Sequence, residues 1–476
     1  MNSKLVTSPN QSAVLSPVRG SVPEVIDAGG RLLHFWDDSV LFVANLLALF
    51  FGNEDQTRLL QNEIRGADSY GGRLLPILNL LYRGGNNVLV LERSPTVPMQ
   101  RYFANELKLS LPKIEILCHR DYLAMGRVAE STGGAGCGGL LERCNVSGIS
   151  FVDGYATDPT LTAIAASLGL PTLSSELGSH RGNNKSLLHD ALVEAGLPVF
   201  ETRHAAAPEE VVHEISQLKI LGYRSAVIKS PLGASGVGIM KVRVDEAEMN
   251  EIPEMLFFEG RCLVQGWLEP GVNGIESITS PSVQMFLNRS QVVIYDVTDQ
   301  FLSDKSVHQG NESPPSYLSA EPELRTELLR QAAIAGSWLH AQGYRGTASV
   351  DFLVVQTRDS SAPTVHVCEI NARVTGATYP SVLARHFRPA GAWLMRNVSL
   401  GEPVRGSQLL ELLKQHGRLF CSGDERGVLP INLNLGDDDT VLKGQFLCLA
   451  DSVDECHAIL GETENDLGVP WRFDRD

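Results

Sequence analysis

The most constraining feature of the sequence is a pair of apolar segments, each carrying acidic or amide residues, joined by a polar turn. The segments are residues 349–355 and 364–371, and the turn between them is rich in Ser, Asp and Pro, a pattern typical of a β-hairpin. Side chains alternate between the two faces of a strand, so Glu369 and Asn371 share one face. A hairpin centred near residue 360 places Asp351 opposite Glu369. We therefore expect two carboxylates and an amide to converge at one end of a sheet.

Oxygen ligands of this kind suit Mg²⁺, which proteins bind through one or two carboxylates together with substrate phosphates; Mn²⁺ is the alternative ion. An acidic residue on a strand is usually just hydrated, but here the neighbouring residues are apolar, so both strands should be mostly buried. Paired buried carboxylates are costly without a cation. We therefore predict a metal site made of Asp351, Glu369 and Asn371. Arg373 is expected to reach a phosphoryl group or a carboxylate, with a salt bridge to one of these acids as the alternative.

A glycine-rich segment forms the second candidate site. A predicted strand, residues 225–229, ends in Lys229, and a turn with three glycines leads into another predicted strand, residues 238–244. Glycine lets backbone N–H groups approach a ligand closely, and successive N–H groups in a turn can cradle phosphate oxygens. An ordinary flexible turn is the alternative. The residues expected around a phosphate chain are Lys229, Ser230, Gly233, Ala234, Ser235, Gly236 and Gly238.

A third segment, residues 264–269, reads as a strand that turns into a linker between two lobes. The backbone N–H and C=O groups of such a linker can bind the edge of an adenine ring. We expect Gln265, Gly266 and Leu268 to take this part. Glu276 is expected to face a ribose or a metal, with Glu269 as the alternative for the ribose.

Residues 31–170 alternate between strand and helix signals, which favours an open α/β domain with a parallel sheet. Expected strands lie at residues 87–92, 113–118 and 148–153. The apolar stretch 40–51 is too short to span a bilayer and is expected to be a buried helix. Residues 133–136 (GGAG) are expected to form a flexible loop, with a phosphate loop as the alternative.

The rest of the chain divides by composition. Residues 1–30 are rich in Ser, Pro, Asn and Val and lack the apolar core of a secretion signal, so we expect a disordered tail. Residues 171–400 carry the three candidate sites. Residues 401–476 contain an expected strand (441–449) and helix (453–460) and are predicted to form a small α+β appendage.

Composition narrows the function classes. The chain has 476 residues and a net charge of −16, which is poorly suited to binding a nucleic-acid backbone. Its eight cysteines are scattered without a C-x-x-C pair, which argues against a zinc site and fits a reducing cytoplasm. No apolar run is long enough for a membrane span, and a G-x-S-x-G hydrolase elbow is absent. The apolar content permits a homodimer.

The order of these segments resembles that of the ATP-grasp superfamily, over residues 171–400. The matching pieces are Asn184-Lys185, Lys229 with its glycine-rich loop, the hinge 264–268, Asp351, and the segment EINARVTG (369–376). The resemblance implies an ATP-grasp fold with a small lobe (180–268) and a large lobe (269–400). It also implies that Lys185 and Lys229 contact ATP phosphates, that the predicted metal ligands hold Mg²⁺, and that Arg373 stabilises an acyl phosphate. Gly266 is a departure, because many members carry an acidic residue there.

A narrower resemblance involves residues 280–284 (SPSVQ), Asp299-Gln300 and residues 369–380. These are similar to segments of ATP-grasp peptide ligases related to the pheganomycin peptide ligase. Those ligases carry an N-terminal pre-ATP-grasp α/β domain, which residues 31–170 are expected to form here. This resemblance implies formation of an amide or peptide bond from amino acids or peptides in small-molecule biosynthesis. The alternatives are a thiol or hydroxyl acceptor, and a nucleotide-binding regulatory protein without ligase activity. The two substrates are not identified by the sequence.

Overall fold

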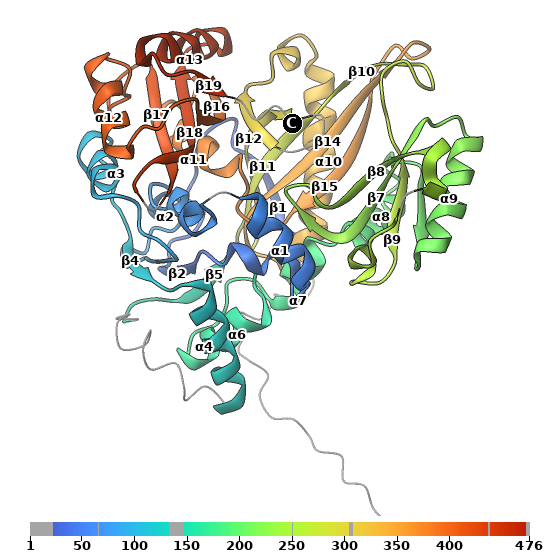
Figure 1. The fold of residues 1–476 in the computed structure, drawn as a ribbon, viewed down its shortest axis with the longest axis horizontal. Helices are drawn as coiled ribbons and strands as arrows, with labels where there is room; N and C mark the ends of the chain where they lie inside the picture. Colours follow the sequence, from blue (N-terminus) through green and yellow to red (C-terminus); the bar gives the residue numbers. More distant parts are fainter. Residues whose placement is uncertain are drawn as a thin grey trace, which may run out of the picture.

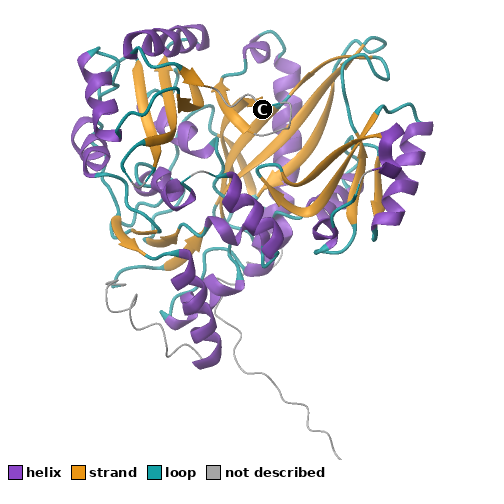
Figure 2. Ribbon diagram, viewed as in Figure 1, coloured by secondary structure: helices purple, strands orange, loops and turns teal. Residues whose placement is uncertain are grey.

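The structure, a computed structural model, describes residues 22–64, 66–132, 147–249, 251–303, 308–436 and 438–472. The expected loop 133–136 and most of the expected tail lie outside these ranges. Three β-sheets organise the described residues. Figure 1 shows the small lobe on the right, the C-terminal strands β17 and β18 on the left and the N-terminal sheet beneath, and Figure 2 shows the helices that cover them. None of the described helices is long and apolar enough to cross a bilayer.

The N-terminal domain is built on a four-stranded sheet in the order β4-β3-β2-β5, with every pair parallel. This confirms the expected open α/β sheet. The central strands are continuous Val and Leu runs, as burial on both faces requires. The elements of this domain are β2 (Val40–Val43), η1 (Leu46–Phe50), α1 (Glu54–Glu63), η2 (Ala67–Leu74), α2 (Leu78–Leu81), β3 (Val88–Leu91), α3 (Val97–Arg101), η3 (Tyr102–Glu106), β4 (Lys113–Ile116), α4 (His119–Thr132), β5 (Phe151–Gly154) and α6 (Pro159–Ser167).

The apolar stretch 40–51 was expected to be a helix, and this prediction is wrong. It begins as strand β2 and ends in the 3₁₀ helix η1. A short, continuous apolar run fits a buried strand as well as a buried helix. Asn45 separates the two parts, since its amide donates to the Tyr122 hydroxyl at 3.0 Å and to the Ala156 carbonyl at 2.7 Å.

The small lobe is a four-stranded antiparallel sheet in the order β6-β9-β7-β8, with α9 packed on it through Val211, Ile215 and Leu218. Strands β7 and β8 form a hairpin whose turn is Ser235-Gly236. Both residues have positive φ, 53° and 83°, as tight two-residue hairpin turns require. The elements here are α7 (Glu176–Gly182), α8 (Lys185–Glu194), β6 (Thr202–Ala205), α9 (Pro208–Ile220), β7 (Ser225–Ala234), β8 (Val237–Arg243), η4 (Val244–Met249), η5 (Glu254–Phe257) and β9 (Cys262–Gly266).

The third sheet has eleven strands, and its main path is β10-β14-β11-β12-β13-β16-β18-β17. Helix α10 packs against β11 and β12 through residues such as Leu328 and Ala332. The elements are β10 (Ile275–Thr279), β11 (Pro281–Leu287), β12 (Gln291–Leu302), β13 (His308–Ser313), η6 (Ser316–Ser319), α10 (Pro322–Ala341), β14 (Gly346–Thr357), β15 (Thr364–Asn371), α11 (Thr378–Phe387), β16 (Ala392–Leu400), α12 (Gly406–Gln415), β17 (Gly427–Leu435), β18 (Val441–Ala450), α13 (Val453–Leu467) and β19 (Trp471–Arg472).

Two segments differ from the sequence-based expectation, and both join this large sheet. Residues 24–27 of the expected tail form strand β1 (Glu24–Asp27), which pairs in parallel with β12. The expected C-terminal appendage extends the sheet, because β18 pairs with β16 from Ala392↔Ala450 to Val398↔Gly444. Pairing between segments so far apart in the chain leaves no local signal in the sequence.

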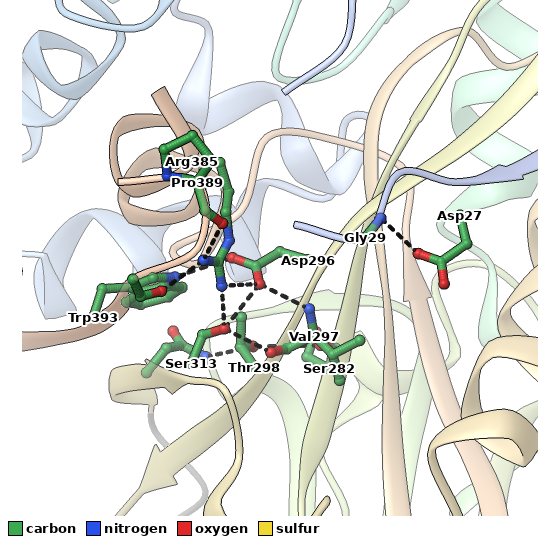
Figure 3. Close-up of polar contacts among 12 residues, drawn as sticks. Asp27, Gly29, Ser282, Asp296, Val297, Thr298, Ser313, Arg385, Pro389 and Trp393 are labelled. Carbon is green, nitrogen blue, oxygen red and sulfur yellow. Dashed lines mark hydrogen bonds and ion pairs between the residues drawn. The ribbon is translucent and has the colours of Figure 1, made fainter. Parts of the chain in front are cut away.

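A buried ion pair fastens α11 to this sheet (Figure 3). The Arg385 guanidinium donates to Asp296 Oδ1 at 2.7 Å, and the two side chains are 6% and 3% exposed. Asp296 lies on β12 and also accepts from Ser313 of β13 at 2.8 Å and from the Trp393 indole of β16 at 3.0 Å. One carboxylate therefore joins three strands and a helix, and its remaining acceptor positions are satisfied, as a buried charge requires.

Replacing this carboxylate should destabilise the fold. In Asp296→Asn the Arg385 guanidinium stays buried without its counter-charge, which we expect to lower the free energy of unfolding by about 3–5 kcal/mol. Urea unfolding followed by tryptophan fluorescence measures the change. The matched control is Glu327→Gln, which breaks the half-exposed Glu327–Arg330 pair and should cost less than about 1 kcal/mol. Equal effects of the two substitutions would contradict the assigned role of Asp296.

Candidate active site

A large cleft, about 1650 Å³, lies between the N-terminal domain, the small lobe and the large sheet. Typical small-molecule sites have about 300–1000 Å³, so this cleft has room for a nucleotide and a second molecule. Most of the site residues predicted from the sequence line it. They are Lys185, Lys229, Gly233, Ala234, Ser235, Gly236, Gln265, Gly266, Leu268, Asp351, Glu369, Asn371 and Arg373.

The predicted hairpin register is confirmed. Asp351 of β14 is the direct partner of Glu369 of β15, and the register shifts at the next pair, so Cys368 forms a bulge. The Asn371 amide lies against both acids, 2.9 Å from Asp351 Oδ2 and 3.4 Å from Glu369 Oε1. Ser282 of β11 donates to the other Asp351 oxygen at 2.6 Å. Rotating the amide by 180° exchanges its oxygen and nitrogen, so three oxygens can converge at this point.

The two acids experience opposite electrostatic environments. Burial, reinforced by repulsion from Glu369, raises the pKa of Asp351 to about 7. Burial alone also raises the pKa of Glu369, but the positive charges of Lys185, Arg373 and Lys229 outweigh it and lower this pKa to about 2. The cations of the cleft therefore compensate the negative charge of ionised Glu369 but leave Asp351 without enough positive charge nearby. An added divalent cation would supply that charge.

Lys185 links the small-lobe loop to the acidic pair. It is the first residue of α8, and the side chain of the preceding Asn184 caps the helix by accepting from Ser186 N and Leu187 N. Its Nζ lies 3.1 Å from Glu369 Oε2 and 3.3 Å from the Gly233 carbonyl oxygen. A buried ammonium at a helix N-terminus also adds to the positive potential of that terminus. This position suits binding of an anion between the loop and the acids.

Lys229 extends from β7 into the same region. Its Nζ lies 3.9 Å from the Cys368 sulfur and 5.6 Å from the centre of the Phe200 ring. Within the described part of the chain it has no carboxylate within 4.0 Å. Its charge is therefore available to a ligand.

Arg373 is held by an amide instead of an acid. Its Nη1 donates to Asn183 Oδ1, and Asn183 in turn bonds the Ala372 backbone at 3.2 Å through both its donor and its acceptor. Neither Asp351 nor Glu369 forms an ion pair with Arg373 in the described structure, so the salt-bridge alternative is wrong. Asn183 was missed as a positioning residue, because its role depends on contacts with Ala372 and Arg373, which lie far along the chain.

Only some residues of the glycine-rich loop line the cleft, and the others pack behind them. Gly233 must be glycine, since a Cβ there would lie 2.7 Å from the Val237 carbonyl oxygen. Ser230 and Gly238 do not line the cleft, contrary to prediction. They face each other beneath the loop: a Cβ on Gly238 would lie 3.3 Å from Ser230 and 2.8 Å from the Gln56 amide nitrogen. Gln56 belongs to the N-terminal domain and contacts the Leu232 carbonyl at 3.4 Å.

The hinge also shows why an acidic residue is missing at position 266. A side chain on Gly266 would meet the Tyr223 ring at 2.3 Å, so the strand tolerates only glycine there. Glu276 does not reach the cleft, contrary to prediction; it is exposed and pairs with Arg358 at 3.7 Å. Glu269 does not line the cleft either and lies 4.0 Å from Lys241. The described structure therefore offers neither acid to a ribose.

Comparison with solved structures establishes the architecture. Biotin carboxylase from Campylobacter jejuni, described as a β-γ-ATP complex, matches with a TM-score of 0.54 and 12% identity over 91% of this chain and 92% of its own. An L-amino acid ligase from Bacillus licheniformis matches with a TM-score of 0.51 and 14% identity, over 92% of this chain and 99% of its own. N5-carboxyaminoimidazole ribonucleotide synthetase from Thermus thermophilus matches with a TM-score of 0.53 and 14% identity, over 90% of this chain and 97% of its own. The chain has the ATP-grasp fold. The fold class expected from the sequence is thereby confirmed. Sequence identities this low establish the fold alone.

One curated relative is similar in sequence to part of this chain. It is the [butirosin acyl-carrier protein]–L-glutamate ligase of Niallia circulans, 30% identical over 177 residues. The match spans 36% of this chain and 38% of the relative's length. No protein-family model matches the chain.

The raised pKa of Asp351 should reduce the stability of the metal-free protein as the pH rises. The unfolded chain releases the Asp351 proton near pH 3.8, whereas the folded protein holds it to about pH 7. Folding therefore takes up a proton between these values, and stability falls as the pH rises through that window. We expect Asp351→Asn to raise the unfolding temperature at about pH 8 and to have a much smaller effect at about pH 4.

Calorimetry in a chelating buffer measures this difference. The control is Glu276→Gln, because Glu276 is exposed and lies outside the cleft. An Asp351→Asn gain that is equal at both pH values would contradict the assigned pKa.

Proposed function

We propose that this protein is an ATP-dependent ligase that joins a carboxylate to an amine through an acyl phosphate. One observation carries the proposal: the ATP-grasp fold brings two lysines, an arginine and an Asp–Glu–Asn set into one cleft. The partial relative supports it, since its name describes a ligase acting on L-glutamate and an acyl-carrier protein. The chain also shares its fold with an L-amino acid ligase, which is compatible with this chemistry.

In this proposal, ATP lies between the small lobe and the large sheet. The turn Gly233–Gly236 and the ammonium groups of Lys185 and Lys229 surround its phosphates, because backbone N–H groups and cations together favour an anion there. The hinge residues Gln265, Gly266 and Leu268 also line the cleft and offer backbone groups to the adenine. Gln265 is itself held by a hydrogen bond to Thr202 at 2.9 Å.

Asp351, Glu369 and Asn371 fit Mg²⁺ because two carboxylates lie against one amide, which adds an oxygen ligand once it is rotated. Bound there, the ion would neutralise charge that develops on the phosphates during transfer. The protein's own contribution is to hold these ligands rigidly, since Ser282 and the facing strands fix their orientation.

The proposed reaction has two steps. A carboxylate oxygen of the first substrate attacks the γ-phosphorus, and the bond from that phosphorus to the bridging oxygen of ATP breaks, giving an acyl phosphate and ADP. The amine nitrogen of the second substrate then attacks the acyl carbon, inorganic phosphate leaves, and the amine loses a proton. Arg373, held by Asn183, is placed to stabilise the acyl phosphate by charge-assisted hydrogen bonds.

A second candidate function keeps the acyl phosphate and changes the acceptor. The relative's name includes an acyl-carrier protein. In this second function the acceptor is therefore a macromolecule with a thiol or hydroxyl group. The two functions differ in their products: an amide resists hydroxylamine, whereas a thioester or an oxygen ester reacts with it.

The proposal predicts ADP release that requires a pair of substrates. Purified protein with Mg-ATP should release ADP at most slowly with one amino acid or carboxylate, and rapidly with a matching carboxylate and amine. Mass spectrometry should find a product lighter than the two substrates together by one water. Nucleotide binding without ADP release for any pair would favour a binding protein over a ligase.

Two variants separate the site from the rest of the molecule in this assay. Glu369→Gln removes a predicted metal ligand and should lower turnover by at least about 100-fold, since even groups that only support a ligand cost about 10–100-fold. Glu276→Gln changes an exposed acid outside the cleft and should leave turnover near that of the unmodified protein. Unchanged turnover in Glu369→Gln would reject the metal assignment.

Nucleotide binding should also protect one cysteine. Cys368 lines the cleft beside Lys229, and burial raises the pKa of its thiol, so alkylation is slow. ATP should slow alkylation of Cys368 further while leaving Cys118, which lies outside the cleft, unchanged. Peptide mass spectrometry after iodoacetamide treatment measures both sites. Equal protection of the two thiols, or none at Cys368, would place the nucleotide elsewhere.

A further inference from the structure

The N-terminal domain places a buried, unpaired cation in the cleft. Arg73 belongs to η2 and is only 5% exposed. Its guanidinium carbon lies 3.7 Å from the centre of the Tyr70 ring. Within the described residues its Nε has no hydrogen-bond partner and its guanidinium forms no ion pair. A buried charge without a partner is unfavourable, so this arrangement calls for an anion from outside the chain.

Arg73 faces the same cleft as the acyl-phosphate site. Arg73, Tyr70 and Arg373 all line it. Tyr70 contacts Arg73 directly and is close enough to Arg373 to affect the pKa of that guanidinium. A molecule whose reacting carboxyl lies at Arg373 therefore has a second guanidinium within reach along the same cleft.

The surroundings of Arg73 supply no counter-charge. His308 is its neighbour, and burial together with the charges of Arg73, Lys443 and Arg396 lowers the pKa of His308 to about 4, so the imidazole is neutral at physiological pH. The nearby Tyr155 hydroxyl is hydrogen-bonded to Tyr379 at 2.7 Å. The described acids that line the cleft are Glu63, Asp351, Glu369 and Glu402, and none lies within 4.0 Å of Arg73.

We propose that Arg73 binds a carboxylate of the substrate other than the one that is activated. The proposal rests on the proposed ligase function and names the substrate class: either the donor is a dicarboxylic acid, or the acceptor is an amino acid with a free α-carboxylate. A planar guanidinium presents parallel N–H donors that match a carboxylate, and stacking on Tyr70 holds that plane. In the proposed function the lysines at the glycine-rich loop serve the nucleotide, and Arg73 lines the cleft from the N-terminal domain.

Binding is tested first, without turnover. Unfolding temperatures are measured with millimolar L-amino acids, their C-terminal amides, dicarboxylic acids and the monoamides of these acids. We expect stabilisation by one class of free carboxylate and not by its amide. Amino acids that stabilise more than their amides point to the acceptor, and dicarboxylates that stabilise more than their monoamides point to the donor. Equal stabilisation by acid and amide in both comparisons would overturn the proposal.

Three variants assign the effect to Arg73. Arg73→Met should abolish the preference for the free carboxylate and weaken its binding by about 10- to 100-fold. Arg73→Lys keeps the charge without the planar donors and should retain part of the preference. The control is Arg58→Met, which removes an exposed guanidinium from α1 of the same domain. If Arg73→Met keeps the full preference, Arg73 is a structural residue and the proposal fails.

The unliganded protein gives an independent check. Because Arg73 is buried without a partner, Arg73→Met should raise the unfolding temperature in buffer of low anion content, and Arg58→Met should not. A carboxylate preference that depends on Arg73, found without ADP release for any substrate pair, would support this subsite and reject the ligase function. ADP release that is indifferent to the second carboxylate and to Arg73 would do the reverse.

Discussion

Two carboxylates buried on facing strands repel each other, and much of the active-site architecture serves to compensate that repulsion. Asp351 and Glu369 are cross-strand partners, and the cations that lower the pKa of Glu369 come from three different segments: Lys185 from α8, Lys229 from β7 and Arg373 from the segment after β15. Charge compensation thus couples the small lobe to the large sheet, because either lobe alone would leave uncompensated charge.

The N-terminal domain completes this arrangement from the other side. Gln56 contacts the glycine-rich loop from below, and Tyr70 and Arg73 face the cleft. All three parts therefore contribute to the cleft: the small lobe provides the glycine-rich loop, the large sheet provides Asp351 and Glu369, and the N-terminal domain provides Arg73. The predicted N-terminal α/β domain is therefore part of the wall of the cleft.

The sequence predicted those features that depend on local periodicity. The pairing of Asp351 with Glu369 followed from a period of two and one polar turn, and the glycine-rich hairpin followed from its residue types. Glu276 was misplaced because β10 has an irregular register near Ile275 and Ser277, which a sequence pattern does not reveal. Arg73 and Asn183 escaped notice because their roles arise from contacts with distant segments. The same reason hid the joining of β18 to β16.

That joining has a consequence for shortened forms of the protein. Strand β16 has β13 on one side and β18 on the other. A chain that ended near residue 400 would expose a row of unpaired N–H and C=O groups along Ala392–Val398, flanked by large apolar side chains such as Trp393 and Leu394. Such an open edge is a template for strands of other molecules. Strand β18, in the region that the sequence analysis treats as a small appendage, therefore also shields this edge of β16 from pairing with other molecules.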